Sequence, residues 1–132
     1  MTLSDLNLHR DMVTQLDNAR DRLQSMCSFL RAQNLDGMPH GTGESRKVEQ
    51  LAILIEQQER EVARLTRIVK RSEPEILAYI DSIQDNRTRQ IFSLYFLCGF
   101  TWATVAAALG GRNTEDGVKS VCYRYLKIDN AY

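Results

Sequence analysis

The sequence predicts an all-α protein in which a long antiparallel helical hairpin precedes a small unit of three short helices. Two long stretches carry apolar residues in alternating steps of three and four, which is the spacing of one helix face. The last third of the chain carries shorter patterns of this kind, separated by glycines. The 132 residues include 7 glycines and 2 prolines, so long helices meet few breakers.

The first helix of the hairpin is predicted from a narrow apolar stripe. Its members are Met12, Leu16, Ala19, Leu23, Met26 and Leu30. They repeat about every 3.5 residues, with polar residues between them, as in helices that pack along one seam. A stripe this narrow needs a partner helix to be stable.

The second helix carries a matching stripe. It consists of Val48, Leu51, Ile55, Gln58, Val62, Leu65 and Val69. Gln58 is its polar member: a buried glutamine can fix register or the number of partners, or its side chain can reach solvent instead. Two such stripes joined by a short connection predict an antiparallel hairpin, which can also form a homodimer.

Residues 33–45 connect the two stripes and are predicted to break the helical pattern, because they include Asp36, Gly37 and Pro39. His40 lies in this connection, but no carboxylate or thiol stands at a motif spacing from it. We interpret residues 39–43 as a tight loop. They are not a phosphate-binding loop, because no Gly-Lys-Ser/Thr sequence follows.

Pro74 predicts that the second helix ends near Ser72, since proline removes a backbone donor and disfavours helical angles in the residue before it. Ser72 then caps a short connecting helix, which a turn at Asp85 closes. Its apolar positions are Ile76, Leu77, Ile80 and Ile83. The expected segments are therefore a hairpin at 1–72, a connecting helix at 73–85 and a C-terminal unit at 86–132.

Three short helical patterns follow. Ile91, Leu94, Tyr95 and Cys98 line the first; Val105, Ala106 and Leu109 line the second; Val118, Val121, Cys122 and Tyr125 line the third. Thr101 is placed to cap the second helix, and Asn113 or Thr114 to cap the third, after a break at residues 110–111. Two short helices, a glycine turn and a third helix with a polar outer face predict a helix-turn-helix, and a plain three-helix bundle is the alternative with the same pattern. Small Ala106 fits the helix-turn-helix, because it lets the last two helices cross closely.

Charge and composition restrict the function further. Residues 1–85 hold 11 basic and 14 acidic residues, a net charge of −3, and residues 86–132 hold 6 and 3, a net charge of +3. We find neither a membrane-spanning stretch nor a signal peptide and expect a cytoplasmic protein. Cys27, Cys98 and Cys122 lie far apart and are expected to be buried free thiols. No metal, cofactor or enzyme motif is present.

Residues 89–110 resemble the start of a sigma-factor region 4 domain, and residues 118–120 match the opening of its recognition helix. With the loop at 39–43 and residues 124–126, most of the chain is similar to phage-encoded transcription regulators of the RinA/ArpU type. The resemblance implies a DNA-binding regulator of phage or prophage genes. One departure is the turn at 111–116, which is longer than in sigma factors.

In a helix-turn-helix the last helix enters the major groove. At about 100° per residue, its outward side collects Asp116, Gly117, Ser120, Tyr123, Arg124 and Lys127, with Lys119 on the flank. Arg124 can reach guanine or a phosphate, Ser120 can serve either, and Gly117 permits close approach. Natural phosphate contacts are Thr101, Arg112, Asn113 and Thr114.

Competing interpretations stay open for some of these residues. Arg124 and Lys127 can instead belong to a solvated face, and Trp102 can pack in the core rather than stack on the DNA backbone. Asp116 repels phosphate unless it accepts from a cytosine amino group or pairs with a cation such as Arg112. A single copy is expected to bind double-stranded DNA weakly, so it needs a second copy or RNA polymerase as a second anchor.

Two other functions fit the same helices. A DNA-packaging recognition subunit, of the small terminase kind, also joins a helix-turn-helix to helical segments that assemble into rings. An interaction module would use the helix-turn-helix to contact RNA polymerase rather than DNA. The sequence favours the transcription regulator, because the charge split and the 99–110 pattern occur together.

Overall fold

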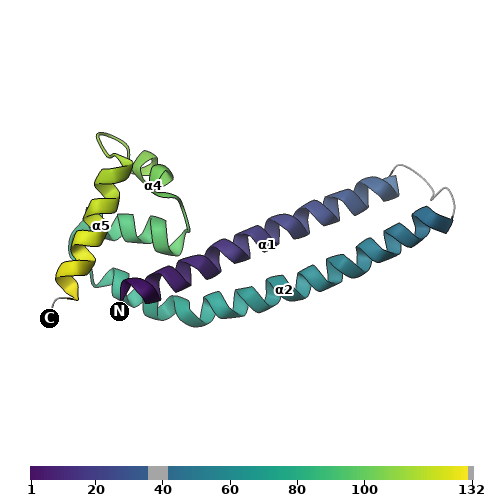
Figure 1. Cartoon of the computed structure of the whole chain (residues 1–132), viewed down its shortest axis with the longest axis horizontal. Coiled ribbons are helices and arrows are strands. Elements are labelled where there is room, and N and C mark those ends of the chain that lie inside the picture. Colours follow the sequence, from purple (N-terminus) through teal and green to yellow (C-terminus); the bar gives the residue numbers. More distant parts are fainter. Residues whose placement is uncertain (36–41, 131–132) are drawn as a thin grey trace. The chain divides into compact units, whose positions relative to one another are not determined.

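The computed structural model describes the backbone of residues 1–35 and 42–130, and their side chains except those of 34–35 and 42–45. This part of the chain is helical, which confirms the all-α prediction (Figure 1). In chain order the elements are α1 (Leu3–Leu35), α2 (Thr42–Asp81), α3 (Asn86–Phe92), the π-helix η1 (Ser93–Leu97), α4 (Trp102–Leu109) and α5 (Glu115–Asp129). Within these ranges no helix has both the length and the apolar content that crossing a membrane requires.

The chain forms two compact units that divide both long helices. One unit, which we call the hairpin unit, is Gln15–Arg67. The other, which we call the core unit, joins Met1–Thr14 to Ile68–Tyr132. The first turns of α1 and the last turns of α2 therefore belong with the short helices, a grouping that sequence order does not suggest.

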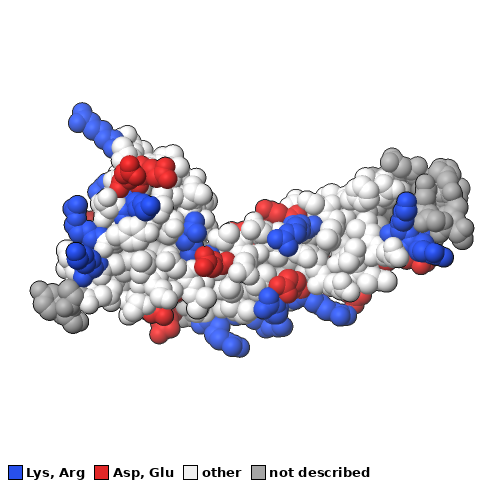
Figure 2. All heavy atoms as spheres, in the orientation of Figure 1, with Lys and Arg blue, Asp and Glu red and all other residues white. Residues whose placement is uncertain are grey.

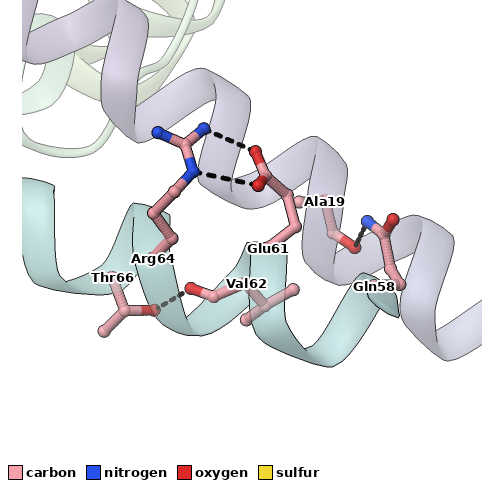
Figure 3. Close-up of polar contacts among 6 residues, drawn as sticks. All are labelled: Ala19, Gln58, Glu61, Val62, Arg64 and Thr66. Carbon is pink, nitrogen blue, oxygen red and sulfur yellow. Dashed lines mark hydrogen bonds and ion pairs between the residues drawn. The ribbon is translucent and has the colours of Figure 1, made fainter. Parts of the chain in front are cut away.

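In the hairpin unit α1 and α2 pack along the two predicted stripes. Leu16 and Ala19 of α1 and Ile55 and Leu65 of α2 are buried, and the other stripe members in this unit are half-buried. The Nε2 atom of Gln58 donates to the backbone oxygen of Ala19 at 2.9 Å (Figure 3). Gln58 therefore joins the two helices and does not extend into solvent, which ties their register to this contact.

Both hairpin helices extend farther into the predicted connection than expected. α1 continues through residues 33–35, and α2 already begins at Thr42. The remaining residues of the predicted break, including Pro39 and His40, lie outside the described residues.

Pro74 does not end the second helix. The expected boundary near Ser72 is wrong, because α2 continues through Pro74 to Asp81. Proline removes one N–H from the helix, but Ile76 and Ile80 beyond it are buried in the core unit, and their packing favours the continuous helix. The Ser72 hydroxyl is not a cap, since it contacts Nδ1 of His9 at 2.6 Å. The predicted turn at Asp85 is found: its carboxylate caps α3 by accepting from the Thr88 N–H at 3.0 Å.

The core unit has one hydrophobic core to which every helix contributes. Its buried members are Leu6, Ile76, Ile80, Ile83, Ile91, Phe92, Phe96, Val105, Ala106, Val118, Cys122 and Leu126. Tyr79 of α2 also donates its hydroxyl to Asp129 of α5 at 2.6 Å. Burial, and to a smaller extent this bond, raise the pKa of Tyr79. The short helices of the C-terminal unit thus share their core with α1 and α2.

The π-helix changes which residues of the first short helix face inward. Phe92 and Phe96 are fully buried, and their rings lie 5.4 Å apart. The Cys98 N–H bonds to the oxygen of Ser93, five residues earlier, so the α-helical spacing does not extend to Cys98. Cys98 is exposed, which corrects the expectation that all three thiols are buried; Cys27 is half-buried and Cys122 buried.

Candidate nucleic-acid interface

The predicted pair of helices with its caps and glycine turn is present. Thr101 caps α4 and accepts from the Thr104 N–H at 3.2 Å. Gly110 and Gly111 follow with φ angles of 68° and 62°, a conformation that side-chain-bearing residues rarely adopt. Of the two candidates for the next cap it is Thr114 that serves, accepting from the Gly117 N–H at 3.1 Å. α4 and α5 are therefore two capped helices joined by a glycine turn, which is the element order of a helix-turn-helix.

α5 has one buried side and one exposed side, as its sequence predicts. Val118 and Cys122 are fully buried, and burial raises the pKa of the Cys122 thiol to about 12. Val121 and Tyr125 are half-buried. The opposite side exposes Asp116, Ser120, Tyr123, Arg124 and Lys127, and Lys119 is exposed on the flank. The charged residues expected to face DNA are thus on the solvent side of the helix.

Gly117 has a role within the protein that its sequence position did not suggest. A Cβ atom at this position would lie 2.9 Å from Oγ1 of Thr114, the same oxygen that caps the helix. Gly117 itself is half-buried. The absence of a side chain here makes room for the Thr114 cap. Close approach of DNA at Gly117 stays a prediction.

Asn113 is half-buried and hydrogen-bonded to other parts of the protein. Its Oδ1 accepts two bonds from the guanidinium of Arg87, at 2.8 and 3.1 Å, and its Nδ2 donates to the oxygen of Gly110 at 2.7 Å. These contacts hold the long turn before α5 against the start of α3. Arg112 and Thr114, next to Asn113, are exposed. Asn113 therefore helps set the direction in which α5 begins.

Arg87 is a residue that the sequence analysis missed. It lies in the first turn of α3 and is exposed. Helical periodicity gives its position on its own helix but not its neighbour 26 positions later in the chain. The nearby Arg89 is used structurally, since it donates to the oxygen of Ile83 at 2.9 Å.

An aromatic cluster lies at the start of α4. The ring of Trp102 stacks on Tyr95, with centroids 3.7 Å apart and an angle of 9° between the planes. Tyr123 of α5 meets the edge of Trp102 at 6.1 Å. On the other side of Tyr95 lies the guanidinium of Arg10, 4.0 Å from the ring centroid. Of the two interpretations of Trp102, this stacking supports packing within the protein. No local sequence pattern points to Arg10, because residue 10 lies in α1, far from Tyr95 and Trp102 along the chain.

The charges near α5 are mixed. Glu115 and Asp116 lie in its first turn, where the helix dipole favours anions, and Lys127 lies in its last turn. Figure 2 shows acidic side chains grouped where α4 and α5 meet, with basic side chains around them and farther along α5. A polyanion would be attracted to the middle and end of α5 rather than to its first turn.

A cavity of about 310 Å³ lies elsewhere in the core unit, between the start of α1 and the end of α2. His9, which is 2% exposed, lines it together with Ser72 and mainly apolar side chains. Burial lowers the pKa of His9, and the nearby Glu73 opposes this effect. Within the described residues no group of three or more His, Cys, Asp or Glu side chains could hold a metal ion.

Comparison with known proteins leaves the helix-turn-helix geometry as the main guide to function. No family model, no curated protein and no solved structure matches this chain. The arrangement itself provides a capped helix with exposed Ser, Tyr, Arg and Lys side chains, held on a second capped helix by a buried core. Such a helix can enter a groove of its own width and donate hydrogen bonds there.

Proposed function

We propose that this chain is a sequence-specific DNA-binding transcription regulator of phage or prophage genes. The observation that carries the proposal is the two-sided α5: Val118, Cys122 and Leu126 are buried, while Ser120, Arg124 and Lys127 are exposed on the opposite side. The resemblance of residues 89–110 to sigma-factor region 4 adds the expected target, promoter DNA. In this role α5 enters the major groove and α4 lies across the backbone.

The exposed residues have distinct roles in this proposal. Arg124 donates to guanine or to a phosphate, and Ser120 contacts a base edge. Lys119 and Lys127 contact phosphates on either side, and Tyr123 lies against the backbone. Thr101 and Arg112 add phosphate contacts from outside α5. Asn113, Thr114 and Gly117 act within the protein by setting the turn and the cap.

The acidic first turn limits how α5 can dock. Glu115 and Asp116 would repel phosphates, so this turn must lie over base edges or away from the backbone. A carboxylate in the groove can accept a hydrogen bond from a cytosine amino group. We therefore expect affinity to depend mainly on the middle and end of α5, where Lys119, Arg124 and Lys127 lie.

One copy of the core unit supplies few cations for DNA. If about four of them neutralise phosphates, the logarithm of the binding constant falls with a slope of only about −3.6 against the logarithm of salt. Binding by one copy would be weak in the cell, so the proposal includes a second anchor. A second copy bound through the hairpin unit, or RNA polymerase, can provide it.

The proposal is tested by comparing two double variants. The target duplex is first selected from a random-sequence pool, and binding is then measured by fluorescence anisotropy at several salt concentrations. Arg124→Ala with Lys127→Ala should weaken binding at least about tenfold and reduce the salt slope by up to about 1.8. The matched control, Lys70→Ala with Arg71→Ala, removes the same charge from exposed positions of α2 in the same unit.

Equal loss in both double variants would show that net charge alone drives binding and would refute the assigned face. Wild-type protein that selects no duplex but captures RNA polymerase would favour the interaction module. A ring-shaped assembly seen by light scattering and electron microscopy would favour the packaging subunit. A monomer or dimer that protects one selected duplex site supports the regulator.

A further inference from the structure

The segment before α4 is held by Arg10, which lies far from it along the chain, in the first turns of α1. Arg10 of α1 donates from Nη2 to the backbone oxygen of Phe100 at 3.2 Å. Phe100 directly precedes Thr101, the cap of α4. One turn farther along α1, Val13 lies against Gly99, where a Cβ atom would be 3.3 Å from Cγ1 of the valine. The segment that leads into α4 therefore rests on α1.

Arg10 also acts on α4 through the aromatic cluster. Its guanidinium lies over one face of Tyr95, whose other neighbour is the parallel ring of Trp102, the first residue of α4. Trp102 in turn meets Tyr123 on the exposed side of α5. Arg10, Tyr95, Trp102 and Tyr123 thus form one continuous series of contacts from α1 to both helices of the helix-turn-helix.

The chemistry at Arg10 is specific to arginine. Its planar guanidinium stacks on a ring and donates sideways to a carbonyl at the same time, which a lysine ammonium does not do. The arrangement has a cost, because the Nε atom is buried with no hydrogen-bond partner in the described structure. A positive charge near a helix N-terminus is also unfavourable to the dipole. General packing would be satisfied by an apolar side chain here.

We propose that Arg10 is a positioning residue for DNA binding. It fixes the start of α4 relative to α5 by holding the Phe100 oxygen and the Tyr95–Trp102 stack. This inference rests on the proposed function, in which Thr101 and α5 contact the same duplex. Two contact surfaces on separate helices must be held within about 0.5 Å of their productive geometry to bind together. Arg10 supplies that constraint from α1.

The test uses the full chain and its single tryptophan, Trp102. In Arg10→Ala, acrylamide should quench Trp102 fluorescence more strongly, and the dissociation constant for the selected duplex should rise about tenfold. The salt slope should stay at the wild-type value, because Arg10 is proposed to hold the protein rather than a phosphate. Arg20 is an exposed arginine on the same helix. Arg20→Ala should leave both the Trp102 quenching and the dissociation constant unchanged.

Arg10→Lys tests whether the positioning requires the planar guanidinium or only a positive charge. It keeps the charge and most of the stem, so it should fold even if Arg10→Ala does not, which circular dichroism checks. We expect increased Trp102 quenching and an intermediate loss of binding. Full wild-type behaviour of Arg10→Lys would refute the role of the planar guanidinium.

The outcomes distinguish this inference from the proposed function. A salt slope reduced by about 0.9 in Arg10→Ala would make Arg10 a phosphate contact and overturn the positioning role. Unchanged binding and quenching in Arg10→Ala, with weakened binding in Arg124→Ala, would overturn the inference alone. Wild-type protein that binds no duplex would overturn the proposed function and this inference with it.

Discussion

The hairpin unit and the core unit use the same two long helices in different ways. In the described part of the hairpin unit, α1 and α2 pack on each other along one narrow stripe with a glutamine in it. In the core unit the ends of these helices supply Leu6, Ile76 and Ile80 to a core shared with four shorter elements. The comparison shows that one continuous helix can belong to two units with different packing. A substitution in these helices should therefore change the free energy of unfolding by an amount that depends on the unit in which the residue lies.

The largest effect is expected where α1 enters the core unit. Leu6→Asp places an unpaired charge at a position that is 0% exposed, and it should lower the free energy of unfolding by more than about 4 kcal/mol. Leu8→Asp is the matched control, because Leu8 is 62% exposed two residues away on the same helix. Urea denaturation followed by circular dichroism measures both. Equal stability of the two variants would contradict the assignment of residues 1–14 to the core unit.

A smaller effect is expected in the hairpin unit. Gln58→Ala removes the bond to the Ala19 oxygen and should lower the free energy of unfolding by about 1 kcal/mol. Gln57→Ala changes an exposed neighbour of the same type and should have little effect. If Gln58→Ala were as stable as Gln57→Ala, the cross-helix bond would contribute nothing to the hairpin. Hydrogen exchange near Ala19 would show whether the loss is confined to this unit.

The smallest effect is a pH dependence that arises in the core unit. Burial lowers the pKa of His9 below its usual value of 6.5, so the folded state binds its proton less readily than the unfolded state. Stability is then fully present above about pH 6.5 and falls as the pH decreases toward the folded-state pKa. His9→Gln, which does not titrate, should reduce the loss of stability between pH 7 and pH 5. An identical pH profile in wild type and variant would refute this contribution.

Much of the candidate interface follows from local sequence. The caps at Thr101 and Thr114, the glycine turn and the buried side of α5 depend on residues within a few positions of each other. The same local rules were wrong at Pro74 and Cys98. Burial of Ile76 and Ile80 favours a helix that the proline alone would end, and the π-helix at Ser93–Leu97 shifts the face that spacing predicts.

The amino-acid pattern by itself determined the all-α class, the two packed stripes and the exposed side of α5, because apolar spacing and capping act over one or two helical turns. Only the tertiary structure decided that α1 completes the core of the short helices, that Arg87 holds Asn113 and that Arg10 holds the start of α4. These contacts join residues up to 90 positions apart, and no periodicity along one helix specifies its partner in another.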